Sequence, residues 1–308
     1  MDIALIIIFN IIPLYILIAL GFISGKWLEV NLPSMATIAI YILAPAVNFG
    51  AMTRLEFKPE FIPLFGLVFI GSATIGFSSY MVARRVLKSN EANLIGMGSV
   101  TGNTGYFGLP IVLALFGPDW AGLYLFINLG AFLNEIGLGY YLGARGHADV
   151  KGALLKVIKL PVIHAVWLGL LANMMDVALP DIALKYWNYA VGAWVIIGMM
   201  LIGVALSKQP KLELDPKLML WMFTPKFILW PLFGAGLIAL DTLFLHNWDA
   251  TVYQLLVIFC CVPLAGNLVA YASTLHLHPE RTAGAVLVST LLGIVIIPSA
   301  LALYSFLM

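Results

Sequence analysis

The chain has 308 residues, of which 62% are hydrophobic and only 10% are charged, and its formal net charge at pH 7 is +1. A soluble domain carries about 25% charged residues, so this composition excludes water as the main solvent of the folded chain. The near-neutral balance also provides no basic surface, and nucleic acid is not expected as a partner. The chain is therefore expected to fold in a lipid bilayer.

Long apolar segments, bounded by charges or turn residues, recur along the whole chain. A hydrocarbon core about 30 Å thick requires about 20 apolar residues per helix, and lipid offers the backbone no hydrogen-bond partners, so each segment should be helical. The sequence predicts an all-α polytopic membrane protein with ten transmembrane helices, at about residues 3–23, 32–52, 61–82, 92–116, 121–142, 157–175, 187–206, 218–240, 251–275 and 283–308.

The first apolar segment is expected to be retained as a helix. Asp2 stands where a secretion signal would be basic, and no small-residue cleavage site follows the segment. The two cysteines, Cys260 and Cys261, are adjacent within a later apolar run. Because that arrangement suits neither a disulfide framework nor a tetrahedral metal site, the sequence predicts no metal and no cofactor.

Lysine and arginine are divided unequally between two sets of loops, and cytoplasmic loops carry the excess. The even-numbered predicted loops hold only Arg54, Lys58 and Lys185, and Lys226 lies within a predicted span. The other basic residues fall in the odd-numbered loops: Lys26, Arg84, Arg85, Lys88, Arg145, Lys151, Lys156, Lys159, Lys208, Lys211, Lys217 and Arg281. Both termini are therefore predicted to lie outside.

The chain divides into two halves, residues 1–146 and 147–308, each with five predicted helices. Leu32-Pro33 opens the second helix of the first half, and Leu179-Pro180 precedes the second helix of the second half. Because each half has an odd number of helices, the two must insert in opposite orientations. This is the inverted-repeat arrangement of secondary transporters.

The fourth predicted helix is interrupted by the run from Thr101 to Pro110, and the ninth by the run from Val262 to Asn267. Glycine costs about 1 kcal/mol and proline about 3 kcal/mol relative to alanine in a helix, so both runs are expected to unwind. Unwound backbone is tolerated at membrane depth only where it is buried in protein or lines a cavity. Paired breaks favour a binding site; the alternative is that both prolines only kink packed helices.

The breaks predict a binding site for a small anion. Half-helix N-termini present unpaired N–H groups that attract negative charge, and two asparagines add amide donors. The predicted substrate-binding residues are Asn103, Thr104, Gly105, Tyr106, Pro110, Pro263, Gly266, Asn267 and, in the second helix, Asn48. Asn128 and Asn134 are further candidates, although interhelical hydrogen bonding explains any of these asparagines equally well.

Ionisable residues within the predicted spans are Glu135 and Lys226, with His164 as a titratable third that is more simply explained by packing. Intramembrane charges are candidates for function. Glu135 and Lys226 lie at similar depth, about 10 and 12 Å from the cytoplasmic side at about 1.5 Å per residue. We predict that they pair or share a polar pathway, with Asn134 nearby, and that Glu135 loads a coupling proton. A purely structural ion pair is the alternative.

The run from Gly102 to Pro110, the segment from Pro263 to Asn267, and His278-Pro279-Glu280 before the last helix resemble the auxin efflux carrier family in its bacterial form. The resemblance covers the whole chain. It implies a 5+5 inverted repeat with crossing broken helices 4 and 9, an architecture like that of bile-acid symporters and Na+/H+ antiporters. It also implies a scaffold of helices 1, 2, 6 and 7, a moving domain of helices 3–5 and 8–10, and a homodimer formed through the scaffold.

Members of this family move small organic anions, such as auxin or malonate, across the plasma membrane, which is the inner membrane in bacteria. Leu264-Ala265-Gly266 departs from the family's usual ninth-helix motif, so the resemblance does not transfer the substrate.

The sequence thus predicts a secondary transporter of a small organic anion that works by alternating access of the elevator type. A sodium-coupled symporter of similar architecture is the nearest alternative. An enzyme or sensor embedded in the membrane is the alternative from another class. An enzyme is not expected, because the chain has neither the H-E-x-x-H metal motif nor the G-x-S-x-G nucleophile motif.

Overall fold

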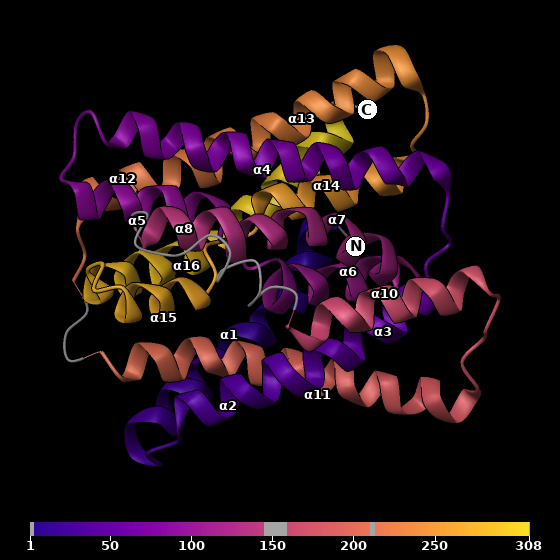
Figure 1. Cartoon of the computed structure of the whole chain (residues 1–308), viewed down its shortest axis with the longest axis horizontal. Coiled ribbons are helices and arrows are strands. Elements are labelled where there is room, and N and C mark those ends of the chain that lie inside the picture. Colours follow the sequence, from indigo (N-terminus) through magenta and orange to yellow (C-terminus); the bar gives the residue numbers. More distant parts are fainter. Residues whose placement is uncertain (1–2, 145–158, 210–212, 308) are drawn as a thin grey trace.

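The computed structural model describes residues 3–144, 159–209 and 213–307, and this part of the chain is helical with irregular connections (Figure 1). Within it, six helices are long and apolar enough to cross a membrane: Leu32–Thr53, Pro59–Ala83, Pro118–Gly143, Asp181–Ser207, Pro216–Leu245 and Pro279–Leu307. Shorter apolar helices lie at Ile12–Trp27, Thr104–Phe116, Pro161–Met174 and Ala250–Cys261. The predicted helical membrane protein is confirmed; the number of ten spans stays a prediction.

Some predicted features lie outside the described residues. They are Asp2, the boundary between residues 146 and 147, and four of the loop cations, Arg145, Lys151, Lys156 and Lys211.

One group of helices forms the lower side of Figure 1 and packs closely. Helix α1 (Ile3–Trp27) packs along α11 (Asp181–Ser207), and α3 (Ala44–Thr53), which continues α2 (Leu32–Ile38), packs along α10 (Pro161–Met174). Glycine allows the α1–α11 backbones to touch, because a Cβ on Gly203 would overlap the Ile18 carbonyl oxygen. Such close approach is how helices associate where lipid removes the hydrophobic drive.

Polar side chains also join this group of helices. Asn173 of α10 donates its amide to the carbonyl oxygens of Thr53 and Leu55, at 2.9 and 2.8 Å. The indole N–H of Trp187 in α11 donates to the Val47 carbonyl at 3.0 Å. Each bond gives a hydrogen-bond donor to a backbone carbonyl that lipid would leave unsatisfied.

The remaining helices form a second group. Helix α4 (Ile62–Ala83) packs against α5 (Ser89–Val100) and α7 (Ala121–Asn134). In the second half, α14 (Ala250–Cys261) packs against α13 (Trp230–Leu240) and α16 (Pro279–Leu307). The short helices α6 (Leu109–Phe116), α8 (Tyr140–Gly143), α12 (Pro216–Thr224) and α15 (Asn267–Thr274) complete the described set of α-helices.

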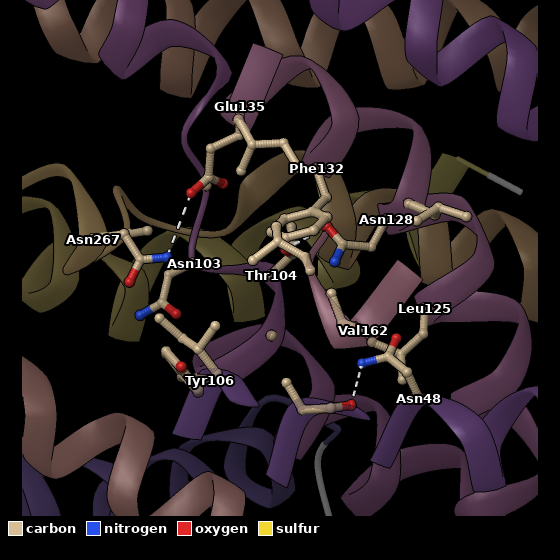
Figure 2. A pocket seen from close by; sticks show the side chains of 18 of the residues that line it. Asn48, Asn103, Thr104, Tyr106, Leu125, Asn128, Phe132, Glu135, Val162 and Asn267 are labelled. Atoms are coloured by element: carbon tan, nitrogen blue, oxygen red, sulfur yellow. Dashed lines mark hydrogen bonds between the residues drawn. The ribbon is translucent and has the colours of Figure 1, made fainter. Parts of the chain in front are cut away.

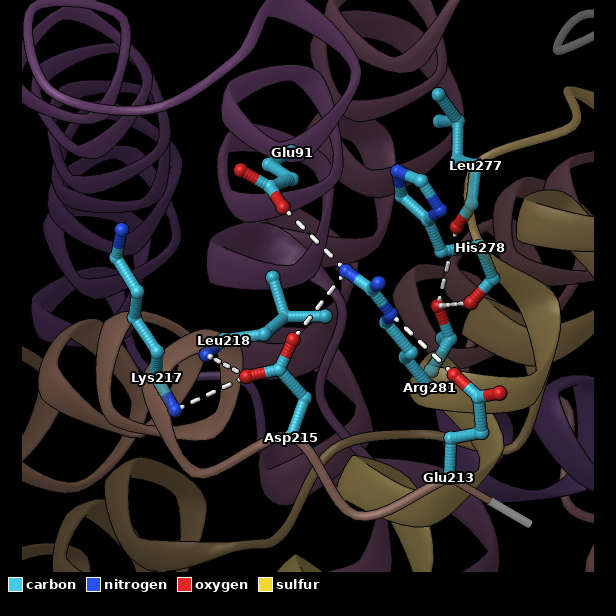
Figure 3. A network of polar contacts seen from close by, with 9 residues as sticks. Glu91, Glu213, Asp215, Lys217, Leu218, Leu277, His278 and Arg281 are labelled. Atoms are coloured by element: carbon cyan, nitrogen blue, oxygen red, sulfur yellow. Dashed lines mark hydrogen bonds and ion pairs between the residues drawn. The ribbon is translucent and has the colours of Figure 1, made fainter.

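A cluster of ion pairs around Arg281 holds helices together at one end of this second group (Figure 3). The Arg281 guanidinium lies 3.4 Å from Glu91 in the first turn of α5, 3.2 Å from Asp215 and 3.5 Å from Glu213. Asp215 caps α12 by accepting from the N–H groups of Lys217 and Leu218. The N-terminal ends of α5, α12 and α16 are therefore held together by one cation.

Five wide π-helical turns occur in four of the described apolar helices: Ala39–Leu43, Thr104–Gly108, Glu135–Gly139, Pro225–Leu229 and Asp241–Leu245, the last two in the same helix. Three of these turns are followed, after one intervening residue, by a proline: Pro45, Pro110 and Pro231. Proline lacks an N–H and clashes with the carbonyl four residues before it, so the preceding turn widens. The turn at Glu135 contains Gly137 and Gly139 in place of a following proline.

Asp241 is a buried carboxylate that the sequence analysis did not single out. Its side chain is fully buried and accepts hydrogen bonds from the N–H groups of Asn247 and Trp248 and from the Tyr253 hydroxyl, at 3.1, 3.0 and 2.6 Å. All its partners belong to the turn between α13 and α14 or to α14 itself. Asp241 therefore stabilises this turn.

The close contact of α1 with α11 predicts a strong effect of Gly203→Leu. The added side chain must separate two backbones, and overpacking of this kind costs about 1 to 3 kcal/mol. We expect a clear loss of thermal stability in detergent, followed by tryptophan fluorescence. Gly192 lies on the same helix with open space around it, so Gly192→Leu is the matched control. Equal melting temperatures for the two variants would contradict the packing described.

Candidate functional site

Two of the spans are broken near their middle, at the two positions expected from the sequence. In the first, α5 ends at Val100, three residues follow without helix, and the chain resumes with the π-helical turn Thr104–Gly108 and α6. In the second, α14 ends at Cys261 and α15 begins at Asn267, with Val262–Gly266 between them. Each break joins the C-terminal end of one short helix to the N-terminal end of another.

The two breaks lie against each other. Gly102 and Leu264 form an isolated antiparallel bridge, and the Asn103 N–H donates to the Pro263 carbonyl at 2.8 Å. The Leu264 N–H is satisfied from outside the breaks by the Ser289 hydroxyl, at 3.2 Å. The unwound backbone thus finds its hydrogen-bond partners inside the protein, as membrane depth requires.

Lys226 lies beside the first break, in the π-helical turn that continues α12. Its side chain is buried, and an ideal Cβ on Gly102 would lie 2.6 Å from its Nζ. The ammonium also acts electrostatically on Cys260 and Cys261, the last residues of α14. Since α5 and α14 both end here, Lys226 places a positive charge next to two negative helix ends.

A cavity of about 560 Å³ lies on the other side of the breaks (Figure 2). This volume is within the range of about 300 to 1,000 Å³ that small-molecule sites occupy. Its wall is contributed by α3, α7, α8, α10, α11 and α15, by the π-helical turns Ala39–Leu43 and Glu135–Gly139, and by both breaks. The cavity is therefore shared between the two groups of helices.

Seven of the residues singled out as substrate-binding or coupling candidates line the cavity: Asn48, Asn103, Thr104, Gly105, Tyr106, Glu135 and Asn267. Asn128 also lies on its wall. Pro110, Pro263, Gly266 and Asn134 are not among the described lining residues. The prolines shape the breaks, and Asn134 donates its amide to the Phe69 carbonyl at 2.6 Å, which ties α7 to α4.

Asn103 differs from every other asparagine of the site. It is 1% exposed, and within the described structure neither its Oδ1 nor its Nδ2 has a hydrogen-bond partner. Leaving a buried polar group unpaired costs about 1 to 3 kcal/mol, so native proteins rarely do so without a reason. The neighbouring amides are occupied: Asn48 donates to the Ala44 carbonyl at 2.8 Å, and Asn128 accepts from Thr104 at 2.5 Å.

Glu135 and Lys226 do not form an ion pair in the described structure. They line the same small chamber behind the first break, together with Thr104 and Asn128. The Glu135 carboxylate instead accepts a hydrogen bond from the Asn267 amide at 3.4 Å (Figure 2). Glu135 therefore faces the cavity wall, while Lys226 stays behind the break.

Several aromatic residues of the wall were missed by the sequence analysis, and three of them, Trp194, Tyr140 and Tyr271, take part in ring contacts. Trp194 of α11 packs edge-on against Tyr106, with ring centroids 5.1 Å apart, and Tyr271 of α15 packs against Tyr140, at 6.3 Å. No local sequence pattern could have identified these residues as a group, because each ring comes from a different segment of the chain. Lys159, just before α10, also lies on the wall, although the sequence analysis placed it only in a loop.

Comparison with known proteins agrees with this architecture. Residues 6–143 match a family model described as "Membrane transport protein". The chain is also 28% identical over 206 residues to an uncharacterized transporter of Methanocaldococcus jannaschii, a match that covers 63% of this chain and 67% of the relative. These matches support the resemblance to the auxin efflux carrier family that the two breaks indicated, and they support a multi-pass membrane transport protein.

The hydrogen bond between Thr104 and Asn128 holds the first residue of the helical segment that follows the first break. We therefore predict an effect of Thr104→Val. This isosteric change removes the donor and leaves the Asn128 oxygen unpaired, which costs about 1 to 3 kcal/mol. We expect a lower melting temperature and impaired transport. Thr104→Ser keeps the hydroxyl and should retain most of both. A valine variant as stable and active as wild type would show that the bond does not hold the break.

Proposed function

We propose that the protein is a secondary transporter that moves a small organic anion by alternating access. The observation that carries the proposal is the buried, unpartnered amide of Asn103 at the wall of the cavity. An amide held in this way keeps its N–H donors available for a solute that carries a hydrogen-bond acceptor. A transporter needs such a site at membrane depth, where the chain can expose it first to one side and then to the other.

The electrostatics of the breaks favour an anion. The π-helical turn that begins at Thr104 and the helix that begins at Asn267 both turn their N-terminal ends to the cavity wall. The first N–H groups of a helix have no partner within it and carry partial positive charge. A carboxylate held by these groups, Asn103 and Asn267 would replace water hydrogen bonds with stronger charge-assisted ones.

The positions of the lining residues support an inward-facing state. Lys159 and Leu160 lie in the loop predicted to be cytoplasmic, and Tyr140 and Tyr271 lie at the ends of their spans on the same side. Towards the opposite side, the Arg54 guanidinium pairs with Asp119. That ion pair joins α3 to the turn before α7, and so bridges the two groups of helices.

An elevator-type movement is part of the proposal, with α1, α2, α3, α10 and α11 as the scaffold. What supports it is the exchange of partners between the halves: α1 of the first half packs on α11 of the second, and α10 of the second packs on α3 of the first. An inverted repeat would produce this reciprocal pairing. The breaks, Glu135 and Lys226 all belong to the other group, which would carry the anion.

Purified protein in liposomes tests the function. Radiolabelled malonate, indole-3-acetate and a panel of other mono- and dicarboxylates are offered under imposed proton, sodium and voltage gradients. We expect saturable uptake of at least one carboxylate above protein-free liposomes. A protein that is folded by its melting curve but moves none of these anions under any gradient would overturn the proposal.

Asn103→Ala should weaken anion binding without destabilising the fold, because the Asn103 side chain makes no hydrogen bond to any of the residues that the structure describes. Loss of a hydrogen bond to a charged group costs about 1.5 to 3 kcal/mol, which is a loss in affinity of about tenfold or more. Asn173→Ala is the contrasting control: its amide bonds two carbonyls, so the melting temperature should fall. Unchanged affinity in Asn103→Ala would remove Asn103 from the site.

A further inference from the structure

We infer that Glu135 is a proton-binding site of the cavity. We also infer that the anion and a proton bind together, because the Asn267 amide contacts the Glu135 carboxyl group and also belongs to the proposed anion site. The inference rests on the proposed function and adds the coupling ion to it. The observation behind it is that one amide, that of Asn267, lies both next to the buried Glu135 carboxyl group and at the proposed anion site.

The first step concerns the position of Glu135. Its side chain is 5% exposed and lines both the large cavity and the small chamber behind the break. It belongs to the π-helical turn Glu135–Gly139, and such turns often mark functional sites. In Figure 2 its carboxyl group points towards Asn267 and the first break.

The second step concerns what surrounds the carboxyl group. Asn267 donates to it from the start of α15 at 3.4 Å, and Tyr271 faces it from the same helix one turn later. Tyr106 faces it from the first break, and Lys226 from the turn after α12. Lys226 is therefore the single cation among these neighbours, and it does not reach ion-pair distance.

The third step concerns the anion. A carboxylate bound at Asn103 and Asn267 would lie beside ionised Glu135, and two negative charges in a buried site repel strongly. A proton on Glu135 removes the repulsion. It also weakens the hold of Glu135 on the Asn267 amide, because a neutral acid accepts hydrogen bonds less strongly than a carboxylate. Asn267 then turns its donors to the anion.

Linkage makes this effect reciprocal. If a proton on Glu135 favours the anion, then the bound anion favours the proton by the same factor. Each binding event should therefore take up one proton from water onto the Glu135 carboxylate. A monovalent anion then crosses the membrane without net charge, and its transport responds to a pH gradient.

Binding calorimetry in detergent tests the coupling with malonate and indole-3-acetate as probes. Heats are measured from about pH 6 to about pH 9 in buffers of different ionisation enthalpy, whose comparison gives the protons taken up per anion. For wild type we expect affinity to fall by up to about tenfold per pH unit at high pH, with uptake approaching one proton. Affinity that is independent of pH, with no proton uptake, would overturn the inference and leave the proposed function intact.

Glu135→Gln is the decisive variant. It should bind the anion with an affinity that no longer depends on pH and should take up no proton. Glu56→Gln is the matched control, because the Glu56 side chain is 84% exposed and pairs only with Lys58; it should behave as wild type. Proton uptake that persists in Glu135→Gln would overturn the assignment to Glu135. If that variant does not fold, the wild-type proton count still decides whether anion and proton bind together.

Failure of the proposed function has a different signature. If the calorimeter and the liposome assay detect neither probe nor any carboxylate of the panel, the anion site itself is wrong and the inference falls with it. If an anion binds without a proton, only the coupling is wrong.

Discussion

The structure depends on the need to satisfy unwound backbone in the middle of a membrane. A run of residues without helix would cost several kcal/mol for each unpaired N–H or carbonyl in lipid. Here the cost is reduced because the two breaks provide hydrogen-bond partners for each other's backbone, through the Gly102–Leu264 bridge and the bond from the Asn103 N–H to the Pro263 carbonyl. Neither break would be stable alone, so the two halves of the chain must fold onto one another at this point.

This contact also determines the electrostatics of the site. Where two helices break side by side, two N-terminal ends and two C-terminal ends meet within a few residues, and their partial charges are opposite. Lys226 lies next to the C-terminal ends, on the side away from the cavity. The N-terminal ends are left for the cavity, where a negative group can approach them. One local constraint thus places a buried cation on one side of the breaks and helix N-terminal ends on the other side, where we propose that the anion binds.

The sequence predicted the breaks well because their cause is local. The glycines and prolines of the runs from Thr101 to Pro110 and from Val262 to Asn267 disfavour helix wherever they occur, and the structure unwinds within both runs, at residues 101–103 and 262–266. The rest of the first run is helical, as the π-helical turn Thr104–Gly108 and the start of α6. The family resemblance followed from the same runs. The number of spans and their inverted repeat are not decided by such local rules, because they depend on how each apolar segment packs and lies in lipid.

The roles of the polar residues could not be predicted, since they depend on contacts between segments far apart in the chain. Asn48, Asn103 and Asn134 look alike in sequence, since each is an amide within a predicted apolar span. The first donates to its own helix, the last ties α7 to α4, and Asn103 alone makes no bond through either atom in the described structure. For Glu135, helical depth suggested Lys226 as partner, but in the structure its carboxylate accepts a hydrogen bond from Asn267, a residue far away in the sequence.

The difference among these asparagines affects how the substrate preference of such a protein can change in evolution. Amides that bond to backbone stabilise the fold and cannot change without loss of stability. The side-chain amide of Asn103 makes no such bond in the described structure, so it can be replaced without that loss, and its identity can change with the solute. The residues between Pro263 and Asn267, where this chain departs from the usual family motif, lie next to that amide. Variation in substrate among related carriers is therefore expected to concentrate at the breaks, while the amides that bond to backbone stay constant.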